Sequence, residues 1–246
     1  MSTEFTYWTE TFKIKQFEID TDGYALLSVI ANYMQEAAGS HAESLGWSMQ
    51  SLLDQNMGWI LNRFTLDIQR YPKAGEEIRI ETWPSGADRL FAYRDFELFD
   101  EQGGLILTAR TAWLILDIKR RRPIATPDDV KEIGARSIRN ARIEIEPKIP
   151  APDGDVTKSI RFPVRRSDLD INQHVNNVRY MEWVLETLFE EQNVRPSFLD
   201  IQFKSEGKYG DVAISERYDA GSGVNIHRIV RESDGKELCV AMVRNA

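Results

Sequence analysis

Between residues 59 and 118, apolar and polar positions follow one another with the period of extended strands. The clearest stretch is 76–83, where Ile78, Ile80 and Thr82 are separated by charged or bulky residues. A period of two is typical of a strand that buries one face. We therefore expect strands over 59–70, 76–83, 90–99 and 105–118. Gly103-Gly104 predicts a tight hairpin turn between the last two.

A helical period precedes these strands. Between residues 25 and 45 the apolar side chains recur three and four positions apart, which predicts a helix with one buried face. They are Leu26, Val29, Ile30, Tyr33, Met34, Ala37 and Ala38.

The same order of elements then starts again. Residues 119–157 are dense in proline and charge, which is typical of a linker. Beyond them we expect a strand over 158–166 and a helix over 175–190, followed by strands near 198–206, 211–219, 223–232 and 236–244. This repetition indicates an internal duplication.

Short sequence echoes accompany the repeated order. Leu66-Asp67-Ile68-Gln69 recurs at 199–202, Gly75-Glu76 resembles Gly210-Asp211, and Tyr33-Met34 recurs as Tyr180-Met181. A long helix followed by antiparallel strands favours an α+β fold in which a sheet wraps around the helix.

Composition narrows the function classes. The net charge of −8 disfavours a nucleic-acid partner, because phosphate contacts need a dense Lys/Arg surface. The single cysteine, Cys239, excludes an intramolecular disulfide. No apolar run approaches the roughly 18 residues of a membrane span, and the N-terminal residues do not resemble a targeting signal. We therefore expect a cytoplasmic protein.

The segment that indicates chemistry is 167–183, SDLDINQHVNNVRYMEW. Acidic and amide side chains crowd around one histidine just before the second helix; they are Asp168, Asp170, Asn172, His174, Asn176 and Asn177. Helix capping explains two or three of them. The alternative is a polar site, where amides at the helix N-terminus stabilise an oxyanion and the histidine relays a proton.

Other chemistries lack their motifs. The three histidines, His41, His174 and His227, are not spaced as metal ligands. No Gly-x-Ser-x-Gly elbow, phosphate loop or dinucleotide fingerprint occurs in the sequence. We expect neither a metal nor a cofactor, and we assign no chemistry to His41 or His227.

LDINQHVNNVRYMEWVLE resembles the signature of the acyl-acyl-carrier-protein (acyl-ACP) thioesterases. The resemblance extends through RYPKAGEEIRIETW, YRDFELFDEQGGLILTARTAWLILD and TPDDV, and covers roughly residues 10 to 244. It implies a tandem double hot-dog fold, with an N-terminal repeat over 1–118 that holds the acyl chain, a linker over 119–157, and a catalytic C-terminal repeat over 158–246.

The resemblance also implies the site and the reaction, which is hydrolysis of fatty acyl-ACP without a cofactor. The family's catalytic residues fall on Asp170, Asn172, His174 and Glu206. Glu206 is expected to act as general base on a water, His174 and Asn172 to hold the water and thioester, and Asp170 to orient the motif. Direct attack by Glu206 stays open.

One residue departs from the family pattern. Many relatives have a cysteine directly after the glutamate, where this chain has Gly207. Cys239 lies in an apolar run and is expected to be a small core residue. A cysteine–histidine mechanism is therefore not expected.

Substrate contacts are less defined. Met34, Ala38 and Trp59 are candidates for the acyl pocket or plain core residues. Arg120, Arg121 and Arg122 form either a solvated surface or a docking site for acidic acyl carrier protein. An acyl-CoA thioesterase on the same fold and a non-catalytic acyl-binding regulator are the alternatives. A monomer and a homodimer both fit the sequence, and chain-length preference is not determined.

Overall fold

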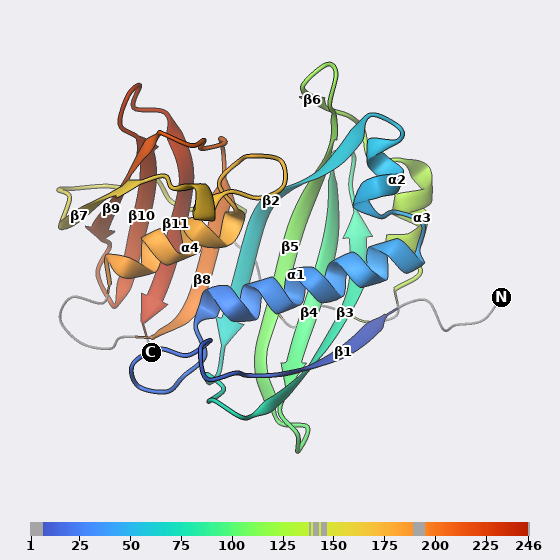
Figure 1. The fold of residues 1–246 in the computed structure, drawn as a ribbon, viewed down its shortest axis with the longest axis horizontal. Helices are drawn as coiled ribbons and strands as arrows, with labels where there is room; N and C mark the ends of the chain where they lie inside the picture. The colour runs from blue at the N-terminus through green and yellow to red at the C-terminus, as the bar shows by residue number, and fades with distance from the viewer. Residues whose placement is uncertain (1–6, 138, 140–142, 144–146, 189–194, 246) are drawn as a thin grey trace. The chain divides into compact units, whose positions relative to one another are not determined.

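The computed structural model describes residues 7–137, 139, 143, 147–188 and 195–245. The chain divides into two compact units, Met1–Glu144 and Ile145–Ala246. Each unit is an antiparallel sheet with a main helix packed on it, α1 in the first unit and α4 in the second (Figure 1). The boundary between the units falls inside the segment 119–157 that the sequence analysis treated as a linker.

The N-terminal unit has its strands in the order β1-β3-β4-β5-β2, and β6 pairs with β5. Its helix α1 contacts β1 and β3. The elements are β1 (Trp8–Lys13), α1 (Leu27–Ser44), α2 (Met49–Leu53), β2 (Met57–Ile68), β3 (Glu77–Ala87), β4 (Phe91–Phe99), β5 (Leu105–Asp117), β6 (Arg122–Pro123) and α3 (Asp128–Ala135).

The C-terminal unit repeats this order as β7-β9-β10-β11-β8, and its helix α4 contacts β9 and β10. A short 3-10 turn, Arg166–Asp168, precedes α4. The elements are β7 (Lys158–Pro163), α4 (Asn177–Glu186), β8 (Pro196–Phe203), β9 (Val212–Asp219), β10 (Val224–Arg231) and β11 (Glu237–Asn245).

Helix α1 buries part of the face that the apolar period predicted: Leu26 lies before the helix and is exposed, and Val29 and Tyr33 are half-buried. The buried residues of α1 include Ile30, Met34, Ala37 and Ala38, which recur three and four apart. The burial of such a face is the main term that stabilises a helix on a sheet, at about 25 cal/mol for each Å² of apolar surface.

The apolar periods did not predict β1, α2, β6 or α3. Helix α3 lies within 119–157 and packs on β3. A Cβ on Gly134 would lie 2.9 Å from the backbone of Gly86, so this close approach requires glycine.

The hydrogen bonds define which residues correspond between the units. The amides of Gln69 and Arg70 donate to the carbonyl of Ile106, and those of Lys204 and Ser205 donate to the carbonyl of Leu238. Gln69 therefore corresponds to Lys204, and the tetrapeptide echo, which aligned Gln69 with Gln202, is displaced by two residues.

Of the other two echoes, one is out of register and one is in register. The helix caps Leu26 and Asn176 correspond, which aligns Tyr33 with Trp183 and displaces the Tyr-Met echo by three residues. Gly75 and Gly210 do correspond, and both have φ of +88° before the third strand of their unit. That backbone conformation favours glycine.

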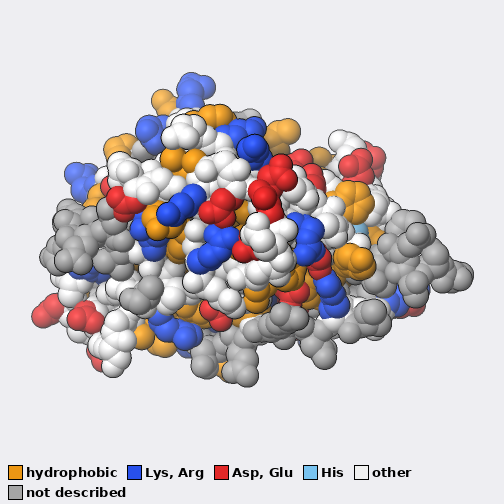
Figure 2. All heavy atoms as spheres, turned by 90° about the horizontal axis from the view of Figure 1, so that it is seen from below, with side chains coloured by type: hydrophobic (Ala, Val, Ile, Leu, Met, Phe, Trp, Pro, Cys, Tyr) orange, Lys and Arg blue, Asp and Glu red, His pale blue; other side chains and the backbone are white. Residues whose placement is uncertain are grey.

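Charged side chains are mixed on the surface. Figure 2 shows one face, on which lysines and arginines interleave with aspartates and glutamates. The net charge of −8 is therefore not gathered into a single acidic patch on this face.

Candidate active site in the C-terminal unit

A tight turn formed by Asp170 presents the candidate residues. Asp170 Oδ1 accepts hydrogen bonds from the amides of Asn172 (2.8 Å) and His174 (3.2 Å). The amide of Asp170 donates to the carbonyl of His174 over 2.8 Å, and Gln173 has φ of +63°. Aspartate favours such turns because its side chain replaces a missing backbone acceptor.

The turn pairs with the loop that follows β8. His174 forms an antiparallel bridge with Lys208, and the amide of Val175 donates to the carbonyl of Gly207 over 2.9 Å. These bonds bring His174 next to Glu206 although the two residues are distant in sequence.

The two side chains form a carboxylate–imidazole pair. His174 Nε2 lies 3.2 Å from Glu206 Oε2, and the side chains are 29% and 38% exposed, respectively. The pair is thus partly desolvated and still open to a substrate or water. A carboxylate held by an imidazole N–H can accept a proton from water.

Tyr180 of α4 holds the residue after Glu206. The amide of Gly207 donates to Tyr180 Oη over 2.8 Å. Burial raises the pKa of Tyr180 above its ordinary value, so this hydroxyl stays neutral. A Cβ at Gly207 would lie 2.9 Å from Tyr180 Oη and 3.0 Å from Val175 Cγ2, so this arrangement leaves no room for a side chain at residue 207.

Asn172 lies at the tip of the turn and is exposed. Its amide N–H binds Asp170, and its side chain makes no hydrogen bond to the described residues. The structure therefore brings Asp170, His174 and Glu206 together, and leaves the Asn172 carboxamide facing solvent.

Helix α4 begins at Asn177, two residues later than predicted. Its cap, Asn176, accepts the amide of Val178 on Oδ1 (3.1 Å) and the amide of Arg179 on its carbonyl (2.9 Å). Over the part of the chain that the structure describes, the amide of Asn177 has no acceptor. One helix N-terminal amide is thus available for an oxyanion.

Asp168 has a structural role. It is buried, and its carboxylate accepts the backbone amide of Arg165 (2.7 Å) and pairs with the Arg165 guanidinium (3.1 Å). Its carbonyl accepts the amide of Asn176 over 2.9 Å. In the polar cluster of the sequence, Asp168, Asp170 and Asn176 thus hold backbone amides, whereas His174 pairs with Glu206.

The N-terminal unit contains the same turn at Asp20. Asp20 Oδ1 accepts the amides of Asp22 (2.9 Å) and Tyr24 (3.0 Å), and its own amide donates to the carbonyl of Tyr24 (2.8 Å). Gly23 has φ of +85°, and Gln173, at the same place in the other turn, also has a positive φ. By this match, Tyr24 stands where His174 stands and Asp22 where Asn172 stands.

The facing loop matches as well. Tyr24 bridges Lys73, and the amide of Ala25 donates to the carbonyl of Pro72 over 2.8 Å. Tyr71 therefore occupies the position of Glu206. The sequence does not reveal this correspondence, because the two turns share only their aspartate.

The acyl-pocket candidates lie in the N-terminal unit. Met34 and Ala38 are buried on α1. Trp59 is half-buried, and its Nε1 donates to the carbonyl of Trp47 over 3.1 Å. These contacts are those of packed core residues, so a role in acyl binding stays a prediction.

Arg120, Arg121 and Arg122 are exposed at the β5–β6 turn. The Arg120 guanidinium lies 3.6 Å from Asp117 Oδ2, with its side chain 68% exposed. The site of the basic run is therefore open to a large partner.

Cys239 and His227 are buried in the C-terminal sheet. Burial raises the pKa of the Cys239 thiol, which disfavours a thiolate. Burial lowers the pKa of His227 to about 3, helped by the charge of Arg217, so this histidine is neutral. His41 is also buried, 3.1 Å from Arg94.

Among the described residues, no group of three or more His, Cys, Asp or Glu side chains is arranged to hold a metal ion. No described helix is long and apolar enough to cross a membrane.

Two family models match the chain. Residues 6–133 match the acyl-ACP thioesterase N-terminal domain. Residues 150–244 match the acyl-ACP thioesterase C-terminal domain.

Curated relatives are similar over much of the chain. A palmitoyl-acyl carrier protein thioesterase of Cuphea hookeriana is 28% identical over 247 residues, covering 93% of this chain and 60% of the relative. A dodecanoyl-[acyl-carrier-protein] hydrolase of Cinnamomum camphora is 31% identical over 212 residues, covering 80% and 55%. The chain thus spans about 60% of the length of the first of these relatives.

Solved structures match the whole fold. An acyl-ACP thioesterase from Bacteroides thetaiotaomicron superposes with a TM-score of 0.88 at 25% identity and covers 100% of both chains. A 12:0-ACP thioesterase from Umbellularia californica superposes with a TM-score of 0.86 at 24% identity, covering 98% of this chain and 97% of that one. The predicted hot-dog fold is confirmed.

Proposed function

The chain belongs to the acyl-ACP thioesterase family, and on that basis we propose that it hydrolyses fatty acyl-ACP and releases the free fatty acid. The observation that carries the proposal is the His174–Glu206 pair, whose Nε2 and Oε2 atoms lie 3.2 Å apart beside the Asp170 turn. The pair is accessible, and a carboxylate and an imidazole are the groups that hydrolysis by water requires.

In the proposed reaction, Glu206 takes a proton from water as the water oxygen bonds to the thioester carbonyl carbon. His174 Nε2–H donates to Glu206 and orients its carboxylate. The amide of Asn177 stabilises the carbonyl oxygen as it gains negative charge. The carbon–sulfur bond then breaks, and the carrier thiolate takes the proton from Glu206. Asn172 is proposed to contact the bound thioester or water.

Direct attack by Glu206 is the second chemical route. It forms an acyl–glutamyl anhydride and expels the carrier thiolate, and water then hydrolyses the anhydride. A single turnover in ¹⁸O water identifies the anhydride route if solvent oxygen enters Glu206, whereas label in the fatty acid alone agrees with both routes. The general-base route places solvent oxygen in the fatty acid in the first turnover. Attack of water on the Glu206 side of an anhydride would place it in Glu206 instead.

Carrier protein is the proposed substrate carrier, with Arg120, Arg121 and Arg122 as its docking site. The chain and an acidic carrier repel each other at long range, so encounter needs a local basic patch. We further propose that Met34, Ala38 and Trp59 contact the acyl chain in the N-terminal unit. Replacing Ala38 by Leu would then shift the preference toward shorter chains.

The experiment compares one acyl group carried by ACP and by CoA, with release of free thiol as the readout. Replacing Arg120, Arg121 and Arg122 by Ser should lower kcat/KM for acyl-ACP, and the loss should shrink at high salt. Thioesters of small thiols should change little. Lys131→Ser with Arg136→Ser, at exposed side chains on and just after α3, is the control for loss of positive charge elsewhere in the same unit.

The outcomes separate the alternatives. A higher kcat/KM on CoA than on ACP would assign the chain to acyl-CoA hydrolysis. No thiol release from any acyl thioester, together with acyl binding, would support a regulator. Cell fractionation and sedimentation test the proposed cytoplasmic location and the choice between monomer and homodimer.

A further inference from the structure

Arg231, at the end of β10, binds the backbone of the proposed general base. Its Nη2 donates to the carbonyl of Glu206 over 2.8 Å. Its Nε lies 3.3 Å from Asp211 Oδ2, and the Arg231 side chain is only 21% exposed. One guanidinium thus contacts both the start and the end of the segment 206–211.

Further hydrogen bonds also hold the backbone of this segment. Asp211 Oδ2 also accepts the amide of Lys208 over 2.9 Å. The amide of Gly207 binds Tyr180. The bonds from Arg231 and to Tyr180 hold the Glu206–Gly207 peptide, and the amide of Ser205 donates to the carbonyl of Leu238 over 3.1 Å, so the backbone is held on both sides of Glu206.

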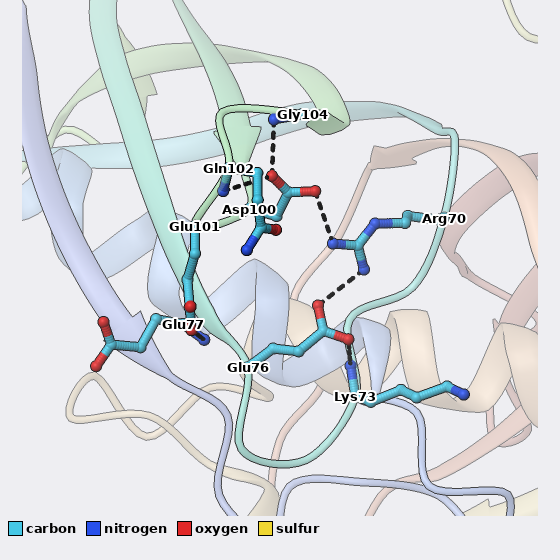
Figure 3. Close-up of polar contacts among 8 residues, drawn as sticks. All are labelled: Arg70, Lys73, Glu76, Glu77, Asp100, Glu101, Gln102 and Gly104. Carbon is cyan, nitrogen blue, oxygen red and sulfur yellow. Dashed lines mark hydrogen bonds and ion pairs between the residues drawn. The ribbon is translucent and has the colours of Figure 1, made fainter.

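We call an arginine, together with the groups through which it holds this loop, a clamp. The N-terminal unit has a corresponding clamp at Arg70, drawn in Figure 3. Arg70 Nη1 lies 2.9 Å from Glu76 Oε2 and Arg70 Nη2 lies 3.1 Å from Asp100 Oδ2. Glu76 Oε1 accepts the amide of Lys73 over 2.9 Å, as Asp211 accepts that of Lys208. The hydrogen bond from Arg70 holds the pKa of Asp100 below its usual value.

The arginine occupies a different position in each clamp. Strand pairing aligns Asp100 with Arg231, because Arg79 pairs with Phe99 and Ile214 with Val230. The arginine belongs to the loop in the N-terminal unit and to the strand in the C-terminal unit. Arg70 joins two carboxylates, Glu76 and Asp100. Arg231 also lies 3.3 Å from two carboxylates, Asp211 and Asp234, and in addition gives one N–H group to the carbonyl of Glu206.

We propose that Arg231 is a positioning residue that fixes Glu206 for proton transfer with His174; this inference rests on the proposed function. Ion pairs alone are enough to hold such a loop in place, as those of Arg70 do in the N-terminal unit. The bond to the Glu206 carbonyl adds direct control over the residue that acts. Misplacement of a reacting group by about 1 Å can cost about 100-fold in rate.

The test replaces each arginine in the full chain: Arg231→Met, Arg231→Lys and, as the matched control, Arg70→Met. Arg231→Met should lower kcat about 10-fold or more while KM changes by less than about threefold, because binding does not need the exact position of the base. Arg231→Lys, which keeps one charged donor, should recover part of kcat. Arg70→Met should lower the melting temperature similarly and keep kcat within about twofold.

Two results would overturn the inference: an Arg231→Met enzyme that keeps more than half of the wild-type kcat, or an equal loss of kcat in Arg70→Met. Glu206→Gln is measured beside them. If it keeps its activity, the proposed function of Glu206 fails. If it is inactive while Arg231→Met is fully active, only the positioning role of Arg231 fails.

Discussion

A turn of the same geometry precedes the main helix in each of the two units. Only the turn of the C-terminal unit carries a carboxylate–imidazole pair. Asp20 and Asp170 each accept two amides two and four residues ahead. Tyr24 and Tyr71 occupy in one unit the positions of His174 and Glu206 in the other. The comparison separates the residues that build the turn from those available for chemistry.

The comparison gives a structural basis for the role expected of Asp170, which is to orient the motif. An aspartate that forms the same turn without a neighbouring histidine is needed for backbone geometry. Asp170 therefore orients the motif by fixing amides, while His174 and Glu206 are the groups specific to the C-terminal unit. Substitutions at corresponding positions of the two units therefore test this difference.

The largest effect is expected at Glu206. Glu206→Gln keeps the size of the side chain but removes its ability to take a proton, so kcat should fall by about 10² to 10⁴. Tyr71→Phe, at the corresponding position, should stay within about threefold. Steady-state thiol release measures both, and a Glu206→Gln enzyme with more than half of the wild-type kcat would contradict the assignment.

The aspartates should separate stability from activity. Asp20→Ala and Asp170→Ala each remove one acceptor of two amides, which costs about 1 to 3 kcal/mol in the free energy of unfolding. Urea unfolding should therefore show similar losses in the two variants. Only Asp170→Ala should lower kcat, by about 10-fold, because only that turn carries His174. Equal loss of kcat in both variants would contradict this view.

The strand and helix periods predicted most of the fold, because buried faces leave a periodic signal. The predicted helix over 25–45 is α1, Leu27–Ser44, and the strand over 105–118 is β5, Leu105–Asp117. Helix α2 was missed because five residues are too few for a period. The prolines and charges of 119–157 concealed α3.

The candidate site was predicted through the resemblance, whereas its repeat was not. Two of the three sequence echoes are out of register. The tetrapeptide recurs after 133 residues where the units correspond at 135 (Gly75 to Gly210), and Tyr-Met recurs after 147 where they correspond at 150 (Asp20 to Asp170). The clamp at Arg231 could not be predicted either. A guanidinium that binds a backbone carbonyl 25 residues away leaves no pattern in the sequence.

The smallest effect is expected at His227, which corresponds to Phe96 by strand pairing. Its ordinary pKa of 6.5 is lowered to about 3 in the folded state, chiefly by burial. Above pH 6.5 both states are neutral there. As the pH falls from 6.5 toward 3, only the unfolded chain gains the proton, so the folded state loses stability.

His227→Phe should flatten this acid dependence. The substitution gives up the 3.1 Å contact between Nδ1 and Thr187 Oγ1, but it also removes Nε2, which is buried without a hydrogen-bond partner among the described residues. The free energy of unfolding at pH 7 should therefore change by about 1 kcal/mol or less. Urea unfolding at pH 7 and pH 4 measures the slope, and an unchanged slope would contradict the role of His227.

The exchange of the residues that distinguish the two turns tests the central claim most directly. His174→Tyr installs in the C-terminal turn the residue that the N-terminal turn already accommodates, and Tyr24→His makes the reverse change. Thiol release from acyl-ACP at saturation should fall at least about 100-fold in His174→Tyr and stay within about threefold in Tyr24→His, with both proteins folded by circular dichroism. If folded His174→Tyr keeps wild-type turnover, or if Tyr24→His loses as much as His174→Tyr, the C-terminal pair is not the site of the reaction.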